Sequence, residues 1–154
     1  MPALVRAAPR LVARPLRDGE RGALEAALAK AALPTADIEV PGRLFWRFET
    51  ADALPVGFGG LEPYGDDALL RSVVTLPPAR GRGIGAAIVA ALELEAQLHR
   101  CRSLWVITTS AAEFFARLGY ARCDRTAVPA VIAATTEFSA LCPASADVLM
   151  KRVP

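Results

Sequence analysis

Bulky apolar side chains alternate with other residues over three successive segments in the first half of the chain. These segments are residues 43–50, 55–62 and 68–76, and a turn-forming sequence, PYGDD at 63–67, separates the last two. Alternation with a period of two is typical of half-buried strands, and short turns between strands favour antiparallel pairing. The pattern therefore predicts an antiparallel meander of three strands.

Helical spacing precedes and follows this meander. After an edge strand predicted over residues 10–16, Asp18 is expected to cap a helix in which apolar residues recur on one side, at Leu24, Leu28 and Ala31 or Ala32. Residues 33–38 break that pattern, and we predict a loop there that borders a substrate pocket. A longer helix begins after residue 83, and its buried side is predicted to contain Ile84, Ile88, Ala91 and Leu92, joined by Leu94 and Leu98.

The C-terminal part of the chain alternates strands with helices. Strands are predicted at residues 103–108, 120–123 and 148–152, and a helical segment at residues 129–141. A short helix with a capping box formed by Ser110 and Glu113 is expected to end at Gly119. The order β-α-β-β-β-α-β-α-β-α-β contains a long crossover helix, which joins parallel strands. We therefore predict an α/β (α+β) fold with a mixed central sheet of about six to seven strands flanked by helices.

Composition narrows the class of protein. The 154 residues suit one compact domain, 1–154. Hydrophobic residues make up 53% of the chain, but no apolar run approaches the roughly 18 residues of a membrane span, and residues 1–16 lack the continuous apolar stretch of a secretory signal. The net charge of +2 is unlike that of a nucleic-acid-binding surface. We therefore expect a cytoplasmic protein that binds neither a membrane nor a nucleic acid.

The cysteines and the single histidine give no clear metal signal. Cys101, Cys123 and Cys142 are odd in number and lack C-x-x-C spacing, so we expect buried thiols and no bound metal. The alternative is that the three thiolates bind a soft trivalent metalloid such as arsenic. His99 lies at the end of the long helix, where it complements the helix dipole, and we leave it out of the site.

The glycine-rich loop of residues 80–85, RGRGIG, is the strongest chemical signal in the chain. A strand that leads through such a loop into a helix presents backbone N–H groups at the positive end of the helix dipole, where phosphate binds. Arg80 and Arg82 add charge that can reach a pyrophosphate or an adenosine 3′-phosphate. A purely structural turn is the alternative. The loop lacks the Gly-Lys-Ser/Thr ending of a Walker A loop, and its third glycine comes one residue early for a dinucleotide-binding GxGxxG turn.

Two motifs resemble those of the GNAT superfamily of N-acetyltransferases. The loop matches the superfamily's acetyl-CoA signature, Q/R-x-x-G-x-G/A, at Arg80, Gly83 and Gly85, after a strand that ends in VVTLP at residues 73–77. Residues 112–120, AEFFARLGY, are similar to the later signature A-x-x-F-Y-x-x-x-G-F. The resemblance implies a GNAT fold, with acetyl-CoA as co-substrate and no metal.

A narrower resemblance suggests a substrate. Residues 60–65, 69–72 and 136–146 look like the arsenic-resistance-associated acetyltransferase-like proteins. This implies direct transfer, in a ternary complex, from acetyl-CoA to a primary amine of a small molecule, such as the glutamate analogue arsinothricin, in detoxification. Two alternatives stay open: an acyl-CoA-binding module with little catalytic activity, and acetylation of a protein N-terminus or lysine.

The assembly and the role of the C-terminal segment are also open. Members of the superfamily often pair, so a homodimer is one candidate assembly. The helical segment has an apolar side that could cover the core, shape the acceptor pocket or meet a partner subunit, and that side contains Val131, Thr135, Phe138 and Leu141.

The resemblance also implies which residues bind the coenzyme. The backbone of Val74, Thr75 and Leu76 would pair with the pantetheine arm, and N–H groups near Leu76 would polarise the thioester carbonyl. The thioester would lie in a gap between the meander and the strand at 103–108. Phe115 would form a wall beside pantetheine. The remaining coenzyme contacts would come from the loop and the start of its helix, at Arg80, Gly81, Arg82, Gly83, Ile84, Gly85 and Ala86.

For the acceptor we predict Glu62 as the general base, because it ends the strand before the coenzyme-binding strand. The alternatives for Glu62 are an ion pair with Arg71 across the hairpin, or exposure to solvent. Arg71 is itself a candidate clamp for an acceptor carboxylate, with Ser72 as a second substrate-binding residue. If it is no clamp, the charge of Arg71 needs a partner within an apolar strand.

The proton donor to the departing thiolate is left unassigned by the sequence. The superfamily often places a tyrosine acid where this chain has Phe115, and we expect Phe114 and Phe115 to pack with Leu118 instead. Tyr120 is expected to pack with its hydroxyl exposed. The candidate substitutes for the missing acid are Tyr64, Tyr120, Ser72, Ser110 or water.

Overall fold

The computed structural model describes residues 10–154, apart from the side chain of Leu141. The prediction that residues 1–16 form no secretory signal concerns, in its first nine residues, a segment outside the described residues. Seven strands form one sheet in the order β1-β2-β3-β4-β5-β7-β6, which confirms the predicted mixed sheet. Only the β4–β5 pair is parallel in the described sheet. The strands are β1 (Val12–Pro15), β2 (Leu44–Glu49), β3 (Pro55–Tyr64), β4 (Asp67–Thr75), β5 (Ser103–Thr108), β6 (Ala121–Cys123) and β7 (Asp147–Arg152).

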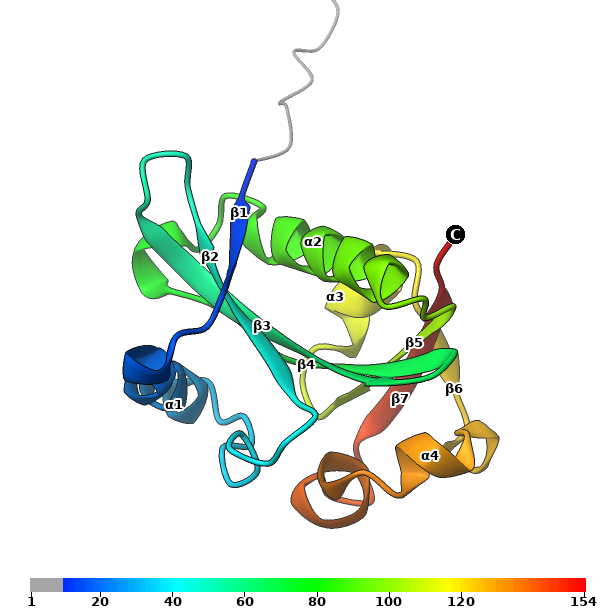
Figure 1. Ribbon diagram of the computed structural model, residues 1–154. Helices are drawn as coiled ribbons and strands as arrows, with labels where there is room; N and C mark the ends of the chain where they lie inside the picture. The colour runs from blue at the N-terminus through cyan, green and yellow to red at the C-terminus, as the bar shows by residue number, and fades with distance from the viewer. Residues whose placement is uncertain (1–9) are drawn as a thin grey trace, which may run out of the picture.

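Helices cover both faces of this sheet (Figure 1). On one face lie α2 (Ile84–Leu98) and α3 (Ala112–Arg117), and on the other lie α1 (Arg21–Lys30) and α4 (Ala130–Ala133). The crossover through α2 joins the parallel strands β4 and β5, as the predicted order requires. Within residues 10–154, no helix has the length and apolar character to cross a membrane.

The main core lies between α2 and the sheet. Leu92, Val89 and Ala96 are buried there, and a fully buried aliphatic side chain contributes about 1.5–3 kcal/mol by leaving water. The expectation that Leu94 and Leu98 share the buried side is wrong, because they are 61% and 76% exposed. Leu94 lies two residues, or roughly 200°, round the helix from Leu92 and so faces away from the sheet.

A second core lies under α1 on the opposite face. Leu24 and Leu28 are fully buried, as predicted, and pack with Phe58 of β3 and Val74 of β4. The helix ends before residues 31–32, which are exposed rather than part of the buried side. This packing fixes α1 and the loop after it beneath the middle of the sheet.

Two predicted helix caps are wrong. Asp18 lies in a 3-10 turn and makes no capping hydrogen bond, whereas the carboxylate of Glu20 accepts a backbone N–H three residues earlier (2.9 Å). Ser110 and Glu113 form no capping box at the start of α3. Thr108 Oγ1 accepts two backbone N–H groups there instead (2.9 and 3.3 Å). In both places a neighbouring side chain accepts the free N–H groups instead, and sequence spacing does not show which side chain will do so.

The C-terminal helical segment is shorter and more irregular than predicted. Gly119, with φ +95°, ends α3 as expected. The segment 129–141 forms α4 and then a separate π-helical turn, Glu137–Leu141. Between them, the hydroxyl of Thr135 donates to the carbonyl of Ile132 (2.7 Å). Such side-chain hydrogen bonds compete with a regular helix, and π-helical turns are frequent at functional sites.

Candidate active site

The parallel strands β4 and β5 separate part of the way along the sheet. Their pairing covers Asp67–Leu69 against Ser103–Trp105 and then stops, although both strands continue. A cavity of about 210 Å³ occupies the gap that follows, and we call it the gap cavity. The predicted gap is therefore present. The lining comes from residues 70–73 of β4 and 106–108 of β5, with Ala31, Leu33, Ser110, Ala111, Phe115 and Glu137.

A bulge bends β4 beside the gap cavity. Ser72 has φ +58°, a left-handed conformation that costs a residue other than glycine about 1–2 kcal/mol. Opposite it, the pairing register of β3 shifts between Phe58 and Gly60. The hydroxyl of Ser72 accepts a hydrogen bond from Nε of Arg71 (3.1 Å). Strained backbone and bulges gather at functional sites, and Ser72, a predicted substrate-binding residue, lines the cavity.

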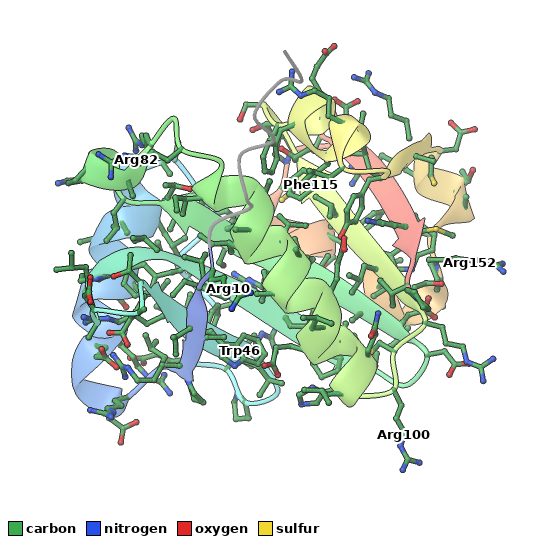
Figure 2. The ribbon with its side chains drawn as sticks, turned by 90° about the horizontal axis from the view of Figure 1, so that it is seen from above. Arg10, Trp46, Arg82, Arg100, Phe115 and Arg152 are labelled. Carbon is green, nitrogen blue, oxygen red and sulfur yellow. The ribbon has the colours of Figure 1, made fainter. Side chains whose placement is uncertain are left out.

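The glycine-rich loop has the geometry of an anion site. Gly81 and Gly83 have φ of +81° and +73°, so the backbone turns in a way that side-chain-bearing residues rarely adopt. Gly83 immediately precedes α2, whose first N–H groups have no acceptor inside the helix. Arg82 is exposed at this end of α2, and Arg100 lies past the other end (Figure 2). Arg80 is exposed too, and its Nε donates to the carbonyl of Thr75 (3.3 Å).

The residues that follow the loop have unequal access to a ligand. Ile84 is only 6% exposed and packs in the main core, so its backbone alone is available. A Cβ on Gly85 would lie 3.3 Å from the ring of Phe114, so glycine lets α2 approach α3 closely. Ala86 is half-buried. These positions therefore offer backbone N–H groups rather than side chains.

The end of β4 supports the predicted coenzyme strand only in part. Val74 is 7% exposed and its side chain packs under α1, while Thr75 is half-buried and opposes Gly57 of β3. The N–H of Leu76 donates to the carbonyl of Val56 (2.9 Å). The N–H of Leu76 therefore already has an acceptor in the hairpin. That N–H groups near Leu76 polarise the thioester carbonyl stays a prediction, and it would fall to neighbours of this N–H.

Four charged side chains form a buried ion-pair cluster, which we call the Arg71 cluster: Asp37, Arg43, Glu62 and Arg71. Nη2 of Arg71 donates to Asp37 (2.7 Å) and Nη1 donates to Glu62 (2.8 Å). Burial alone would raise the pKa of Asp37, but the hydrogen bonds and charge of Arg71, with the charge of Arg43, lower it overall. Burial acts against the charge of Arg71, but the carboxylates raise its pKa above the ordinary value.

Glu62 is enclosed rather than open to an acceptor. It is 0% exposed. Its Oε2 faces Arg71, and its Oε1 accepts the hydroxyl of Tyr64 (2.7 Å) and lies 3.5 Å from Nε of Arg43. The structure thus contains the Glu62–Arg71 ion pair that was the alternative for this residue. Since Glu62 is absent from the described lining of the gap cavity, its role as a base stays a prediction that this geometry does not favour.

Arg71 lies at the gap cavity, but four of its five N–H groups already donate to other side chains. Nε donates to Ser72, and the two Nη atoms donate to Asp37 and Glu62. Asp37 lies in the loop that was predicted to border a substrate pocket, 34 residues from Arg71 in sequence. A bidentate carboxylate clamp at Arg71 would therefore have to displace one of these partners, because only one N–H, on Nη2, remains for a ligand.

Glu137 is a residue of the gap cavity that the sequence predictions missed. It opens the π-helical turn, is 5% exposed, and lines both the gap cavity and an adjoining cavity of about 250 Å³. Within residues 10–154, its buried Oε2 has no hydrogen-bond partner. Burial raises the pKa of Glu137 to about 7, although the charge of Arg71 opposes this shift. The available signal was that Glu137 is the one charged residue between Arg125 and Asp147.

The candidate proton donors differ in whether they line the gap cavity. Ser72 and Ser110 line the gap cavity, as does Phe115, which is 5% exposed. Tyr64 instead donates to Glu62, and burial together with that carboxylate raises the pKa of Tyr64 to about 12. Both serine hydroxyls therefore stay available as proton donors at the gap.

Tyr120 packs as expected, but its hydroxyl is not exposed. The residue is 3% exposed, stacks edge-on against Phe115, and donates to Glu93 (3.4 Å). Burial, then the charge of Glu93, raises its pKa above the ordinary value. Tyr120 therefore belongs to the core beneath α2 rather than to the gap.

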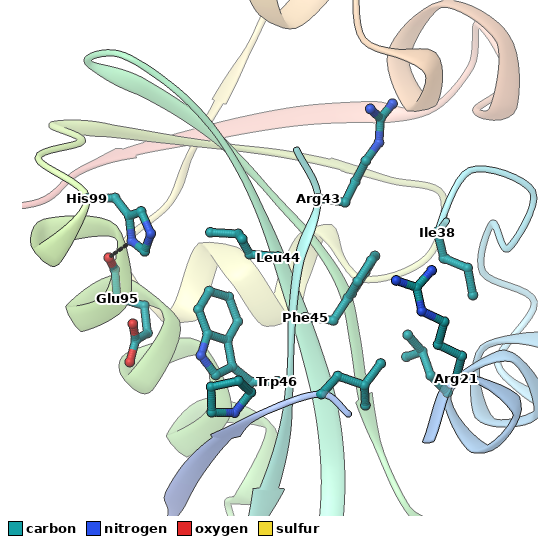
Figure 3. A pocket seen from close by; sticks show the side chains of 11 residues that line it. Arg21, Ile38, Arg43, Leu44, Phe45, Trp46, Glu95 and His99 are labelled. Carbon is teal, nitrogen blue, oxygen red and sulfur yellow. Dashed lines mark hydrogen bonds between the residues drawn. The ribbon is translucent and has the colours of Figure 1, made fainter. Parts of the chain in front are cut away.

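A separate hollow of about 390 Å³ lies along the N-terminal end of β2 (Figure 3). Trp46 and Phe45 line it, and Arg43 extends from it towards the C-terminal turn, where Nη2 donates to Thr136 (3.2 Å). His99 borders the hollow with Nδ1 2.9 Å from the carbonyl of Glu95. The hollow shares no lining residue with the gap cavity, so His99 stays outside the candidate site.

The three cysteines do not come together. Cys101 lies in the core beneath α2, whereas Cys123 and Cys142 pack on the α4 face. Burial raises the pKa of Cys142 to about 11, which disfavours a thiolate. Among residues 10–154, no group of three or more His, Cys, Asp or Glu side chains is placed to hold a metal ion. This arrangement is that of separate, partly or fully buried thiols.

Comparisons with known proteins agree with this geometry. A family model described as "Acetyltransferase (GNAT) domain" matches residues 41–122, which contain β2 to β5, the first two residues of β6 and the glycine-rich loop. No curated protein matches the chain in sequence.

Solved structures share the fold across nearly the whole chain. N-acetylglutamate synthase from Neisseria gonorrhoeae, complexed with coenzyme A and L-arginine, has 16% identity and a TM-score of 0.75. The match covers 94% of this chain and 34% of that chain, so this chain spans about a third of the length of that protein. Rv2747 from Mycobacterium tuberculosis, in complex with CoA and NLQ, has 25% identity, a TM-score of 0.73, and coverage of 93% of this chain and 99% of that one. Spermidine N-acetyltransferase from Vibrio cholerae has 14% identity, a TM-score of 0.66, and coverage of 92% and 93%.

Proposed function

Because the chain belongs to the GNAT acetyltransferase family, we propose that it transfers an acetyl group from acetyl-CoA to a primary amine of a small molecule, directly and within a ternary complex. The observation that carries this proposal is the gap cavity, which begins where β4 and β5 stop pairing. The cavity lies on the strand that leads into the glycine-rich loop. One ligand can therefore reach from the loop, along β4, into the gap.

The coenzyme site that we propose combines the loop with the end of β4. The pyrophosphate would bind the N–H groups of residues 81–86, and the exposed guanidinium groups of Arg80 and Arg82 would supply charge. Pantetheine would run along Val74 to Leu76 beside Phe115, which lines the gap cavity. Two of the structural neighbours contain coenzyme A, which supports this assignment.

A small amino-acid-like acceptor such as arsinothricin is the finer proposal. The similarity of residues 60–65, 69–72 and 136–146 to arsenic-resistance-associated acetyltransferases supports it, as does a gap cavity of about 210 Å³, which suits a small molecule. The carboxylate of such an acceptor needs a cation. If Arg71 binds this carboxylate in a bidentate way, one internal partner of Arg71 must be exchanged for the acceptor.

The two alternative functions lead to different binding behaviour. An acyl-CoA-binding module is motivated by Phe115 in place of a tyrosine acid, and it would bind coenzyme A without transfer. A protein N-acetyltransferase would need room for a peptide backbone. We also propose that residues 1–154 act as one domain, since the sheet that carries the site runs from β1 to β7. A homodimer is the assembly that we propose for it.

An acceptor screen tests the proposed reaction. Labelled acetyl-CoA is incubated with arsinothricin, phosphinothricin, L-glutamate, spermidine and a peptide with a free N-terminus. Transfer to a small amine supports the proposal, and transfer to the peptide alone supports the protein N-acetyltransferase. Coenzyme A binding without transfer to any acceptor would favour the binding module.

A matched pair of arginine variants tests the coenzyme site. Arg82→Gln removes a charge at the N-terminal end of α2, and Arg100→Gln removes the same charge past the C-terminal end (Figure 2). A charge-assisted hydrogen bond contributes about 1.5–3 kcal/mol, so the Kd for coenzyme A should rise roughly 10-fold to 100-fold in the first variant only. Equal affinities in a calorimetric titration would remove Arg82 from the site.

A further inference from the structure

We propose that Glu137, from the C-terminal turn, completes the acceptor site: its carboxylate holds the acceptor ammonium beside the gap cavity and takes the proton that the ammonium must lose. The inference rests on the proposed function and deepens it. It assigns the base to a residue outside the sheet, in place of Glu62.

The position of Glu137 is the first support. It lines the gap cavity, where the thioester would lie, and the adjoining cavity of about 250 Å³. Leu33, Ile107 and Thr108 line both cavities, so the two spaces meet beside this side chain. The α1–β2 loop and the C-terminal turn lie beneath the same face of the sheet (Figure 1). An acceptor in the adjoining cavity would have its amine between Glu137 and the gap.

The balance of charge is the second support. The Arg71 cluster has two arginines and two carboxylates, and its members pair with one another. Glu137 is an additional carboxylate, and its Oε2 is buried without a hydrogen-bond partner among the described residues. A buried carboxylate without a partner is costly, and it calls for a cation. A primary ammonium supplies that charge together with hydrogen-bond donors.

The turn that carries Glu137 is held in place by its neighbours. The hydroxyl of Thr136 accepts a hydrogen bond from Arg43 (3.2 Å), which ties the turn to β2 and the Arg71 cluster. The N–H of Cys142 donates to the carbonyl of Glu137 (2.9 Å). A base must keep its distance from the reacting nitrogen, and these contacts limit the movement of the turn.

The charged and titratable groups around Glu137 make it suitable as a base near neutral pH. Burial favours the neutral acid, Arg71 favours the carboxylate, and Glu62 and Asp37 oppose the carboxylate, which together raise the pKa of Glu137 to about 7. The charge of Glu137 in turn contributes to the raised pKa of Cys142. A general base is most effective when its pKa lies near the working pH.

The proton and electron balance of the step is simple. The acceptor ammonium gives one proton to the Glu137 carboxylate and becomes a neutral amine. Its nitrogen bonds to the thioester carbon, and the C–S bond breaks with the electron pair on sulfur. The second proton lost by nitrogen ends on the thiolate, for which the hydroxyls of Ser72 and Ser110 are the available relays at the cavity. The proton on Glu137 then returns to solvent.

The test compares Glu137→Gln with Glu25→Gln, an exposed glutamate on α1. We expect Glu137→Gln to lower kcat by about 100-fold, in the range for loss of a general base, and to remove the rise of kcat/KM with pH near 7. The Kd for coenzyme A should be unchanged, because Glu137 is not a coenzyme contact. Glu25→Gln should match the original protein, and urea unfolding confirms that each variant folds.

Three results would decide against Glu137 or against the proposed reaction. If Glu137→Gln keeps kcat within threefold and keeps the same pH profile, Glu137 is not the base. If the original protein acetylates none of the amines in the screen, the proposed reaction fails for that panel. The role of Glu137 is then judged by NMR titration of its carboxyl carbon in the coenzyme A complex with spermidine. A lowered pKa supports ammonium binding, and an unchanged pKa overturns it.

Discussion

The buried carboxyl of Glu137 makes the stability of the folded protein depend on pH in a direction opposite to that of most acidic residues. In the folded state burial raises its pKa from the ordinary 4.5 to about 7. The folded protein therefore binds more protons than the unfolded chain in this interval. The stability contributed by the neutral acid is fully present below pH 4.5 and is lost as pH rises through 7.

The size of the effect follows from the shift. Each pKa unit corresponds to about 1.4 kcal/mol, so a shift of about 2.5 units corresponds to about 3 kcal/mol across the window. Glu137→Gln has no charge to bury. Relative to the original protein, this variant should gain about 3 kcal/mol of unfolding free energy between pH 4.5 and pH 8.

Urea unfolding followed by tryptophan fluorescence measures this difference, because Trp46 and Trp105 are both buried. Glu25→Gln, at an exposed position, is the control and should show no such gain. Asp37 titrates below this window because its pKa is lowered. A difference between Glu137→Gln and the original protein that stays constant from pH 4.5 to 8 would refute the raised pKa.

Five further variants, at four positions, test the structure around the site and on α1. Arg71→Met leaves Asp37 and Glu62 buried without their main partner and should lower the unfolding free energy by about 3–5 kcal/mol, as measured by urea unfolding. Gly57→Ala places a Cβ against the carbonyl oxygen of Val74 and should lower the unfolding free energy by about 1–3 kcal/mol. In the control variant Gly22→Ala, on α1, the added Cβ meets no neighbouring atom, so the unfolding free energy should be unchanged or higher by up to about 1 kcal/mol. Ser72→Val should lower the melting temperature more than Ser72→Ala, because a β-branched residue tolerates φ +58° poorly.

The predictions that succeeded depend on neighbours in sequence. Alternation over residues 43–76 gave the correct hairpins, since side-chain direction in a strand depends only on position along it. The glycine-rich loop was located because its turn and the start of α2 are formed by consecutive residues. Leu94 was misplaced on α2 because its apolar character was weighed above its position, roughly 200° round the helix from Leu92.

The candidate acceptor site could be predicted far less well. Glu62 and Arg71 were identified as a possible pair from one hairpin, but Asp37 joins them from a loop 34 residues away. Glu137 reaches the gap cavity from 66 residues beyond Arg71, after two more strands and three more α-helices. Spacing along the chain carries no information about such encounters.

The sequence by itself therefore determined the strands, the crossover helix and the backbone of the proposed coenzyme site, because these depend on local periodicity and on glycine's access to positive φ. Only the tertiary structure decided which charges meet. It paired Glu62 with Arg71 and left Glu137 as the buried carboxylate without a described partner, because packing of distant segments sets the solvation and the partners of each ionisable group.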